Sequence, residues 1–383
     1  MPGIKIKSFK NVDTVMLAIV IVLMLLGITM LLSASTAFGE DRKGDPYFYF
    51  NEQLPSLLIA IATGTVLFFI PYSFWMRSAS VLTIATIIVL VMMLLVPGFA
   101  KDVKKTTRFL SVVSFQPSEA ARLVLVILLA KYFSYYGKLI RSNFFYGILG
   151  PFLILVLFSG LVIKQRDLGG GIIIAIIVIL MMIAAGSRIW GLGFVLSFLG
   201  YFFLRLIKDM VYRNDRIVGW DNPWLDPSNV GDNIIQAYYA FGRGSLTGVG
   251  PGQSQQKMLF LPESHTDYIF AVIGEELGLI GVISLCLLFL VLGGRGFMTA
   301  RSAKTISGYY LAVGMTLCVI VPAFINMAVA LSIIPAKGLP LPFFSYGGSS
   351  LLVTLSAIGI IMGIHHQSLN YSGNEYIKMS QAK

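Results

Sequence analysis

The sequence has little charge and almost no cysteine. Only 12% of its 383 residues are Asp, Glu, Lys or Arg, whereas a soluble domain carries about 25%. This scarcity excludes an ordinary soluble domain. Its two cysteines, Cys286 and Cys318, both lie inside apolar runs. There they are typical of small core residues, which argues against a disulfide pair or a cysteine-based metal site.

Long apolar runs take up most of the chain instead. Hydrophobic residues make up 56% of it, and the mean hydropathy is +0.81. A spanning helix needs about 20 mainly apolar residues. Runs near or above this length lie at 14–35, 54–70, 79–97, 119–136, 144–163, 169–186, 189–207, 267–291, 308–334 and 344–364. The sequence therefore predicts an all-α polytopic membrane protein, a single membrane domain over 1–383 with ten transmembrane helices and both termini on one side.

The distribution of basic residues predicts the orientation. Segments 71–78, 137–143 and 292–307 contain Lys or Arg and no acid, which is the pattern of cytoplasmic loops. We therefore expect an uncleaved first helix, a cytoplasmic N-terminus and a cytoplasmic tail at 365–383. The net charge of +11 suits contact with anionic membrane lipids or an anionic lipid-linked substrate, although basic loops also arise from topology alone.

Two longer polar segments are predicted on the other side. Residues 98–118 alternate basic and apolar groups, as an interfacial or re-entrant element would. Residues 208–266 form a large extracytoplasmic loop between helices 7 and 8, far longer than a usual connection. This loop is too aromatic for disorder, and we expect 233–242 to form a short amphipathic helix.

Asp267 is the most informative single residue. It ends the long loop, in the string PESHTDYIFAVIGEELG at 262–278. A carboxylate at the rim of a bilayer is costly, so it marks a functional site by default. The alternative is that Asp267 only caps the helix that follows. His265, Glu275 and Glu276 add further ionisable groups nearby, and Glu275 either acts on the cavity through Arg122 or forms a structural ion pair.

Two helix starts carry further charges. In FQPSEAAR at 115–122, Pro117 suits a first helical turn, and Glu119 and Arg122 share a helix face and can form an ion pair. They either line a hydrophilic cavity or satisfy each other. In QRDLGGG at 165–171, Asp167 is predicted to be a helix N-cap.

Two glycine-rich strings predict irregular backbone. Gly248, Gly250 and Gly252 allow tight turns near a ligand. The string KGLPLPFFSYGGSS at 337–350 comes directly before the last helix, and broken backbone at membrane depth must be buried in protein or line a wet cavity. Its polar side chains could bind a sugar or phosphate, or the string could simply make a sharp turn.

Together these strings, in this order, closely resemble the SEDS family of bacterial cell-wall proteins (FtsW, RodA and SpoVE). The resemblance extends from DPYFYFNEQL at 45–54 to SYGGSSLL at 345–352, and is closer to the division and sporulation branch than to the elongation branch. It implies a peptidoglycan glycosyltransferase of the bacterial cytoplasmic (inner) membrane. The implied substrate is lipid II, an undecaprenyl-diphosphate-linked disaccharide pentapeptide, and the implied partner is a class B penicillin-binding protein. We expect no nucleic acid partner.

The resemblance also assigns roles to residues. It implies that Asp267 is catalytic, and we expect it to be the general base. The residues predicted to bind substrate are Glu119, Arg122, Arg243, Lys257, His265, Lys337, Ser345, Tyr346 and Ser349. Those predicted to shape the cavity are Pro117, Asp167, Glu275, Glu276, Gly347 and Gly348. No metal ligand set is predicted, although a divalent cation (Mg or Mn) would suit the diphosphate.

Departures and rival classes remain open at this point. Phe109, Glu52, Arg166 and Pro322 stand where the family often has other residues, which puts in doubt any transfer of family roles to Phe109, Glu52 and Pro322. A lipid II flippase would also suit ten helices with intramembrane charges and broken helices. A third class is a non-catalytic scaffold of the synthesis complex, which has no need of a buried acid cluster. Small residues such as Gly314 and Ala323 are predicted to offer a lipid-facing surface for the partner's membrane anchor.

Overall fold

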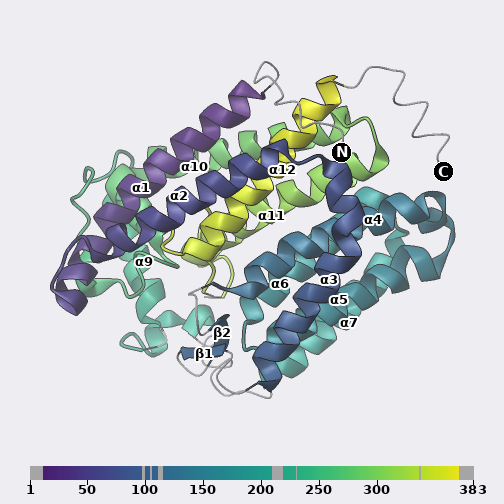
Figure 1. Cartoon of the computed structure of the whole chain (residues 1–383). Coiled ribbons are helices and arrows are strands. Elements are labelled where there is room, and N and C mark those ends of the chain that lie inside the picture. Colours follow the sequence, from purple (N-terminus) through teal and green to yellow (C-terminus); the bar gives the residue numbers. More distant parts are fainter. Residues whose placement is uncertain are drawn as a thin grey trace.

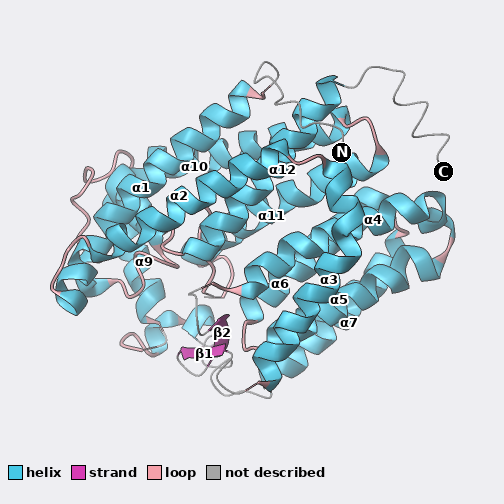
Figure 2. Ribbon diagram, in the orientation of Figure 1, coloured by secondary structure: helices cyan, strands magenta, loops and turns pink. Residues whose placement is uncertain are grey.

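The computed structural model describes residues 12–96, 100–103, 106–110, 115–208, 219–229, 231–335 and 338–370. Long helices dominate this part of the chain (Figure 2). They are α1 (Thr14–Lys43), α2 (Phe48–Phe69), α3 (Tyr72–Leu95), α4 (Pro117–Ser142), α5 (Gly150–Lys164), α6 (Leu168–Ala185), α7 (Ile189–Lys208), α10 (Ile269–Ser302), α11 (Ile306–Ala330) and α12 (Gly348–Asn370). Each corresponds to one predicted span, so the predicted all-α membrane architecture is confirmed.

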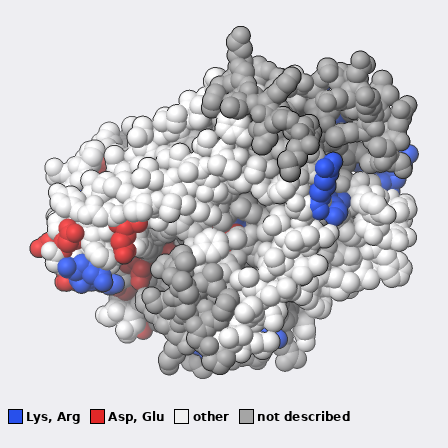
Figure 3. Space-filling view, in the orientation of Figure 1, with Lys and Arg blue, Asp and Glu red and all other residues white. Residues whose placement is uncertain are grey.

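Nine helical segments in the described residues are long and apolar enough to cross a membrane, the fifth being Phe145–Lys164, where the π-helical turn η2 (Phe145–Leu149) leads into α5. The range of α7 matches the predicted seventh span, but its apolar stretch is described only from Ile189 to Tyr201. The count of ten transmembrane helices therefore stays a prediction. On the visible face, acidic residues gather at one end with basic ones beside them, and further basic residues lie towards the other end (Figure 3).

The described parts of both predicted outward segments lie at the same end of the bundle (Figure 1). α1 begins and α12 ends at the opposite end (Figure 1). Within 98–118 the described residues form an antiparallel hairpin of β1 (Ala100–Val103) and β2 (Thr106–Leu110), with Ala100 paired to Leu110. This hairpin is the one departure from an all-α chain among the described residues. The alternation of basic and apolar residues that suggested an interfacial element is also a strand pattern.

The described part of the long loop is structured. It contains the single turn η3 (Pro223–Leu225), the helix α9 (Asp232–Gly244) and the turn η4 (Gln256–Phe260). The prediction of a short amphipathic helix at 233–242 is confirmed, because α9 buries Ile234, Ile235 and Ala240 and exposes Tyr238 and Tyr239.

The centre of the bundle is formed by α11 and α12. α12 packs along α2, and a Cβ on Gly359 would lie 2.2 Å from the carbonyl oxygen of Gly64, so both glycines are needed for this close approach. α11 packs against α4, α6, α10 and α12. This central position determines which residues of α11 can reach other proteins.

Two sequence-based expectations are wrong here. Gly314 faces Val126 and Met181 of the same chain, and Ala323 is fully buried, so neither lies on a lipid-facing surface that could receive a partner. The predicted tail also starts too early, because α12 continues to Asn370 and buries His366, Gln367 and Ser368. In both cases a run of small or polar residues packs against neighbouring helices, which a single sequence does not reveal.

Candidate functional site

Asp267 lies in the turn immediately before α10. The helix begins at Ile269, and its N-cap position is held by Tyr268, which makes no side-chain capping bond. The alternative in which Asp267 is the helix cap is therefore wrong. The side chain is half-buried, and its carboxylate lies beside Gly338: a Cβ on Gly338 would be 2.9 Å from Oδ2 of Asp267. Only a glycine leaves that space to the carboxylate.

The backbone of this turn is held by three donors, one for each consecutive carbonyl. The Tyr346 N–H donates to the carbonyl of His265 at 2.9 Å, and the Ser345 hydroxyl donates to that of Thr266. The amide of Asn326 donates to the carbonyl of Asp267 at 2.8 Å. The strings at 262–278 and 337–350, distant in sequence, thus lie side by side, and the turn that carries Asp267 is fixed in place.

Asn326 is a site residue that the sequence analysis missed. It lies in α11, is fully buried, and its amide also donates to the carbonyl of Leu339 at 2.6 Å. One side chain therefore holds both strings. The sequence did contain a signal, because Asn326 is the only amide side chain in the run 308–334. A polar group buried in an apolar helix is costly unless it is hydrogen-bonded.

His265 is enclosed by aromatic rings. Its ring centroid lies 5.1 Å from that of Phe38 and 4.6 Å from that of Tyr49. Burial lowers the pKa of His265 to about 4, with Glu263 opposing the shift and Arg42 adding to it. The imidazole is therefore neutral at physiological pH. Its Nδ1 atom is buried without a hydrogen-bond partner among the described residues.

Tyr346 connects this aromatic cluster to α2. Its hydroxyl is hydrogen-bonded to the carboxylate of Glu52, and the N–H of the next residue, Gly347, donates to Gln53 at 3.2 Å. Glu52 is one of the positions to which the sequence analysis transferred no role. The structure shows that this acid contacts a predicted site residue directly.

A second polar cluster is built from helix starts. Pro117 is the first residue of α4, and Glu119 and Arg122 form a buried ion pair one turn further on. Asp167 is the N-cap of α6, as predicted, because its Oδ1 accepts from the N–H of Gly170 at 3.0 Å. The other carboxylate oxygen accepts at 3.0 Å from both Gln116 and Ser118.

The two clusters adjoin each other. The Gln116 N–H donates to the hydroxyl of Ser349, at the start of α12, at 2.9 Å. A Cβ on Gly169, two residues after Asp167, would lie 2.7 Å from the side chain of Leu339 and 3.6 Å from the carbonyl oxygen of Gly338. Gly338 in turn contacts Asp267. The start of α6 therefore approaches Gly338 beside Asp267, and the starts of α4 and α12 contact each other. Lys337 lies outside the described residues.

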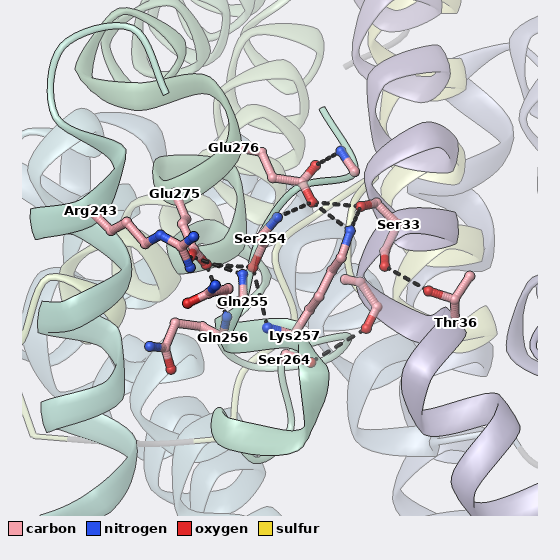
Figure 4. Close-up of polar contacts among 12 residues, drawn as sticks. Ser33, Thr36, Arg243, Ser254, Gln255, Gln256, Lys257, Ser264, Glu275 and Glu276 are labelled. Atoms are coloured by element: carbon pink, nitrogen blue, oxygen red, sulfur yellow. Dashed lines mark hydrogen bonds and ion pairs between the residues drawn. The ribbon is translucent and has the colours of Figure 1, made fainter. Parts of the chain in front are cut away.

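Glu275 and Glu276 form a third cluster that faces the loop (Figure 4). Glu275 pairs with Arg243 at 3.3 Å and accepts from Ser254, Gln255 and Gln256. Glu276 pairs with Lys257 at 2.9 Å and accepts from Ser33, Gly252 and Ser254. Of the two predicted roles for Glu275, the ion pair is the one observed, and its partner is Arg243, because Arg122 pairs with Glu119.

The glycine-rich part of the loop fills a break in α10. Gly278 has φ +66°, and it interrupts the helix. On one side of the break the carbonyls of Glu275 and Glu276 accept from Val249 and Gly250, and on the other side the loop carbonyls of Ser245 and Leu246 accept from Leu279 and Ile280. Gly248, Gly250 and Gly252 all have positive φ. The tight turns therefore let backbone groups of the loop form the hydrogen bonds that the break in α10 leaves unmade.

This cluster uses two of the four basic residues predicted to bind substrate, Arg243 and Lys257. Lys257 is buried and bonded to both Glu276 and Ser33. Arg243 is also paired, but its side chain is 37% exposed. Arg122 is buried beside Glu119, and its Nε has no hydrogen-bond partner among the described residues. Those residues offer no group of three His, Cys, Asp or Glu side chains that could hold a metal ion.

The fold and the site define a multi-pass membrane protein that carries a half-buried carboxylate where a structured loop meets the membrane-spanning helices. The chain belongs to the FtsW/RodA/SpoVE family, whose model, described as "Cell cycle protein", matches residues 13–370. It is therefore a multi-pass protein of the bacterial membrane, and the FtsW-like resemblance is confirmed.

Similar proteins cover nearly the whole chain. A probable peptidoglycan glycosyltransferase FtsW from Geobacter metallireducens is 37% identical, covering 94% of this chain and 96% of its own. The FtsW from Trichlorobacter lovleyi is 38% identical, covering 92% of each. A chain from a study of polymerisation and crosslinking by a peptidoglycan synthase complex has a TM-score of 0.77 at 24% identity, covering 95% of this chain and 100% of its own. The Thermus thermophilus rod shape-determining protein RodA has a TM-score of 0.69 at 22% identity, covering 95% and 99%. These two structures confirm the fold.

Proposed function

We propose that this protein is a peptidoglycan glycosyltransferase that polymerises lipid II at the outer face of the bacterial cytoplasmic membrane. The observation that carries the proposal is the Asp267 turn, whose three carbonyls are held by Tyr346, Ser345 and Asn326 while its carboxylate lies beside Gly338. A fixed backbone presents the carboxylate in one geometry, which is what a general base needs. The FtsW names of relatives that are 37–38% identical support the same activity.

In the proposed reaction Asp267 takes the proton from a sugar hydroxyl of one lipid-linked unit. The hydroxyl oxygen forms a bond to the anomeric carbon of a second unit, and the bond from that carbon to the diphosphate breaks. The diphosphate leaves with the electron pair, and Asp267 holds the proton. Nearby cations stabilise the charge that develops on the leaving group.

Arg122 and Arg243 are the proposed cations for the diphosphate. Arg122 lies in the second turn of α4, whose start is hydrogen-bonded to Asp167 at the start of α6, and the guanidinium of Arg243 is partly exposed. Lys257 is less suited, because its ammonium is buried against Glu276. Ser345 and Ser349 support backbone groups, whereas His265 and Tyr346 form the aromatic wall beside the site. We derive no step through a metal ion.

The proposed partner is a class B penicillin-binding protein that cross-links the strands. A similar chain comes from a synthase complex that couples polymerisation to crosslinking, which supports this pairing. The FtsW-like relatives point to a role in cell division.

Replacement of Asp267 by Asn tests the proposal. Asn keeps the size of the side chain and removes the base, so we expect normal folding and partner binding but a loss of polymer from lipid II of about 10²–10⁴-fold. The measurement is glycan polymer formed by purified protein, with and without the partner. Polymer within a few-fold of wild type would refute the assignment. Lost lipid transport with intact polymerisation would indicate a flippase.

The proposed orientation places the long loop outside and both termini in the cytoplasm. Ser228 and Ser302 are both exposed and lie in the long loop and at the end of α10. In a background lacking Cys286 and Cys318, an impermeant thiol reagent added to intact cells should label Ser228→Cys and not Ser302→Cys. Labelling of Ser302→Cys alone would reverse the topology.

A further inference from the structure

Met258, Leu259 and Phe260 form an apolar loop tip that neither the proposed chemistry nor the core of the protein uses. Their exposed fractions are 58%, 46% and 60%, although both flanking residues, Lys257 and Leu261, are buried. Leu259 also has φ +69°, a conformation that costs energy for a residue with a branched side chain. The chain therefore holds three large apolar side chains outward at an energetic cost.

The height of this tip relative to the membrane follows from two ion pairs. At one end of the bundle Asp13, at the start of α1, pairs with Arg295 of α10 at 2.8 Å. At the other end Lys257 bonds to both Ser33 of α1 and Glu276 of α10 (Figure 4). From Asp13 to Ser33 is 20 residues and from Glu276 to Arg295 is 19, or about 30 Å and about 28 Å of helix at ~1.5 Å per residue.

This separation equals the thickness of the hydrocarbon core of a bilayer, about 30 Å. The sequence of α1 agrees, because residues 14–32 contain no charge and the polar stretch begins at Ser33. The Lys257 pair therefore marks one hydrocarbon boundary, and the apolar tip follows it directly in the chain.

We propose that Met258, Leu259 and Phe260 insert into the acyl chains of the lipid leaflet at this end of the bundle. Large apolar side chains at such a boundary are stabilised by immersion in lipid. Only six residues separate the tip from Asp267, so immersion would set the height of the carboxylate relative to the headgroups. This second consequence rests on the proposed function, in which the substrate is lipid-linked.

The first experiment measures immersion without any substrate. Single cysteines at Phe260 and at Lys43 are labelled with an environment-sensitive fluorophore, in full-length protein lacking Cys286 and Cys318, in phosphatidylcholine nanodiscs. Lys43 is the matched control, because it is exposed and lies about 15 Å beyond Ser33 along α1. We expect quenching by lipids that carry a nitroxide on the acyl chain at Phe260→Cys and not at Lys43→Cys.

An aqueous signal at Phe260→Cys, equal to that at Lys43→Cys, would overturn the proposal. A signal that is aqueous alone and becomes shielded only when the cross-linking partner is added would also overturn it, because the tip would then be a protein-docking surface.

The second experiment separates membrane height from chemistry. A variant with Met258, Leu259 and Phe260 all replaced by Ser should lose roughly tenfold or more polymer from full-length lipid II in bilayers. It should keep its turnover of a short-chain, detergent-soluble analogue. Leu225→Ser, another exposed loop position, is the control and should change neither. Asp267→Asn should lose activity on both substrates. A failure of the proposed function therefore gives a different result from a failure of this inference. Equal losses on both substrates in the triple variant, or none on either, would contradict the inference.

Discussion

Asp267 and the pair Glu275–Glu276 lie within ten residues of each other in the sequence, but the structure places them in different surroundings. Glu275 and Glu276 are 0% and 1% exposed, and each is bonded to a cation and to several loop donors. Around Asp267, three donors hold the backbone carbonyls of residues 265–267, and the side chain is half-buried beside Gly338. Closeness in sequence therefore says little about role: two of these acids hold a loop against a broken helix, and the third is the proposed general base.

The largest expected effect comes from breaking the ion pair between Glu276 and Lys257, which holds the loop against α10. Replacement of Glu276 by Gln leaves the Lys257 ammonium buried without its counter-charge, which typically costs about 3–5 kcal/mol. We therefore expect a clear fall in thermal stability, measured by unfolding of the purified protein in detergent. Polymerisation should fall only as far as the folded fraction falls.

A double variant sharpens this comparison. Changing Glu276 to Gln and Lys257 to Met removes both charges, and a buried ion pair replaced by uncharged groups is often neutral for stability. We expect the double variant to recover most of the lost stability. The Glu276–Lys257 pair would not hold the loop against α10 if Glu276→Gln alone were as stable as wild type. The same conclusion would follow if the double variant were no more stable than Glu276→Gln.

A smaller effect is expected where Asp267 meets Gly338. Ala at position 338 places a methyl group 2.9 Å from the carboxylate oxygen, and the flexible side chain can move away at little cost in stability. Displacing a catalytic group by about 1 Å can cost up to about 10²-fold in rate. Gly338→Ala should therefore reduce polymerisation by about 10–100-fold with little change in thermal stability.

The control for this prediction is Gly242→Ala in α9, where a Cβ would meet nothing within 4 Å. It should leave both activity and stability unchanged. Wild-type activity in Gly338→Ala would mean that the position of the Asp267 carboxylate is less constrained than the structure indicates.

Much of the fold could be predicted from the sequence, because each helix is an apolar run and the bilayer fixes its length. Asp167 as a helix cap, the Glu119–Arg122 pair and helix α9 were likewise local patterns, and they are confirmed. The β1–β2 hairpin was missed, because nothing in its short segment distinguishes a strand from an interfacial element.

The parts that could not be predicted depend on contacts between distant segments. Arg243 and Lys257 looked like free cations, and only the fold shows that acids of α10 already pair with them. Asn326 looked like part of an apolar helix, and its importance lies in two carbonyls from different strings. Gly314 looked like a packing face for a partner, but its neighbours are α4 and α6. The spacing of residues along a helix shows which of them share a face, but it does not show which other segments pack against that face.

The smallest expected effect concerns His265, two residues before Asp267. Burial lowers its pKa from 6.5 to about 4, so between these values the unfolded chain binds a proton that the folded protein does not. Stability from the neutral ring is thus fully present above pH 6.5 and is lost as pH falls towards 4. Thermal unfolding at pH 8, 6 and 4.5 should show a steeper acid loss in wild type than in His265→Phe, which keeps the contacts with Phe38 and Tyr49 but cannot titrate. Parallel curves for the two proteins would mean that His265 is protonated with the same ease folded and unfolded, and the aromatic wall beside Asp267 would then be open to water.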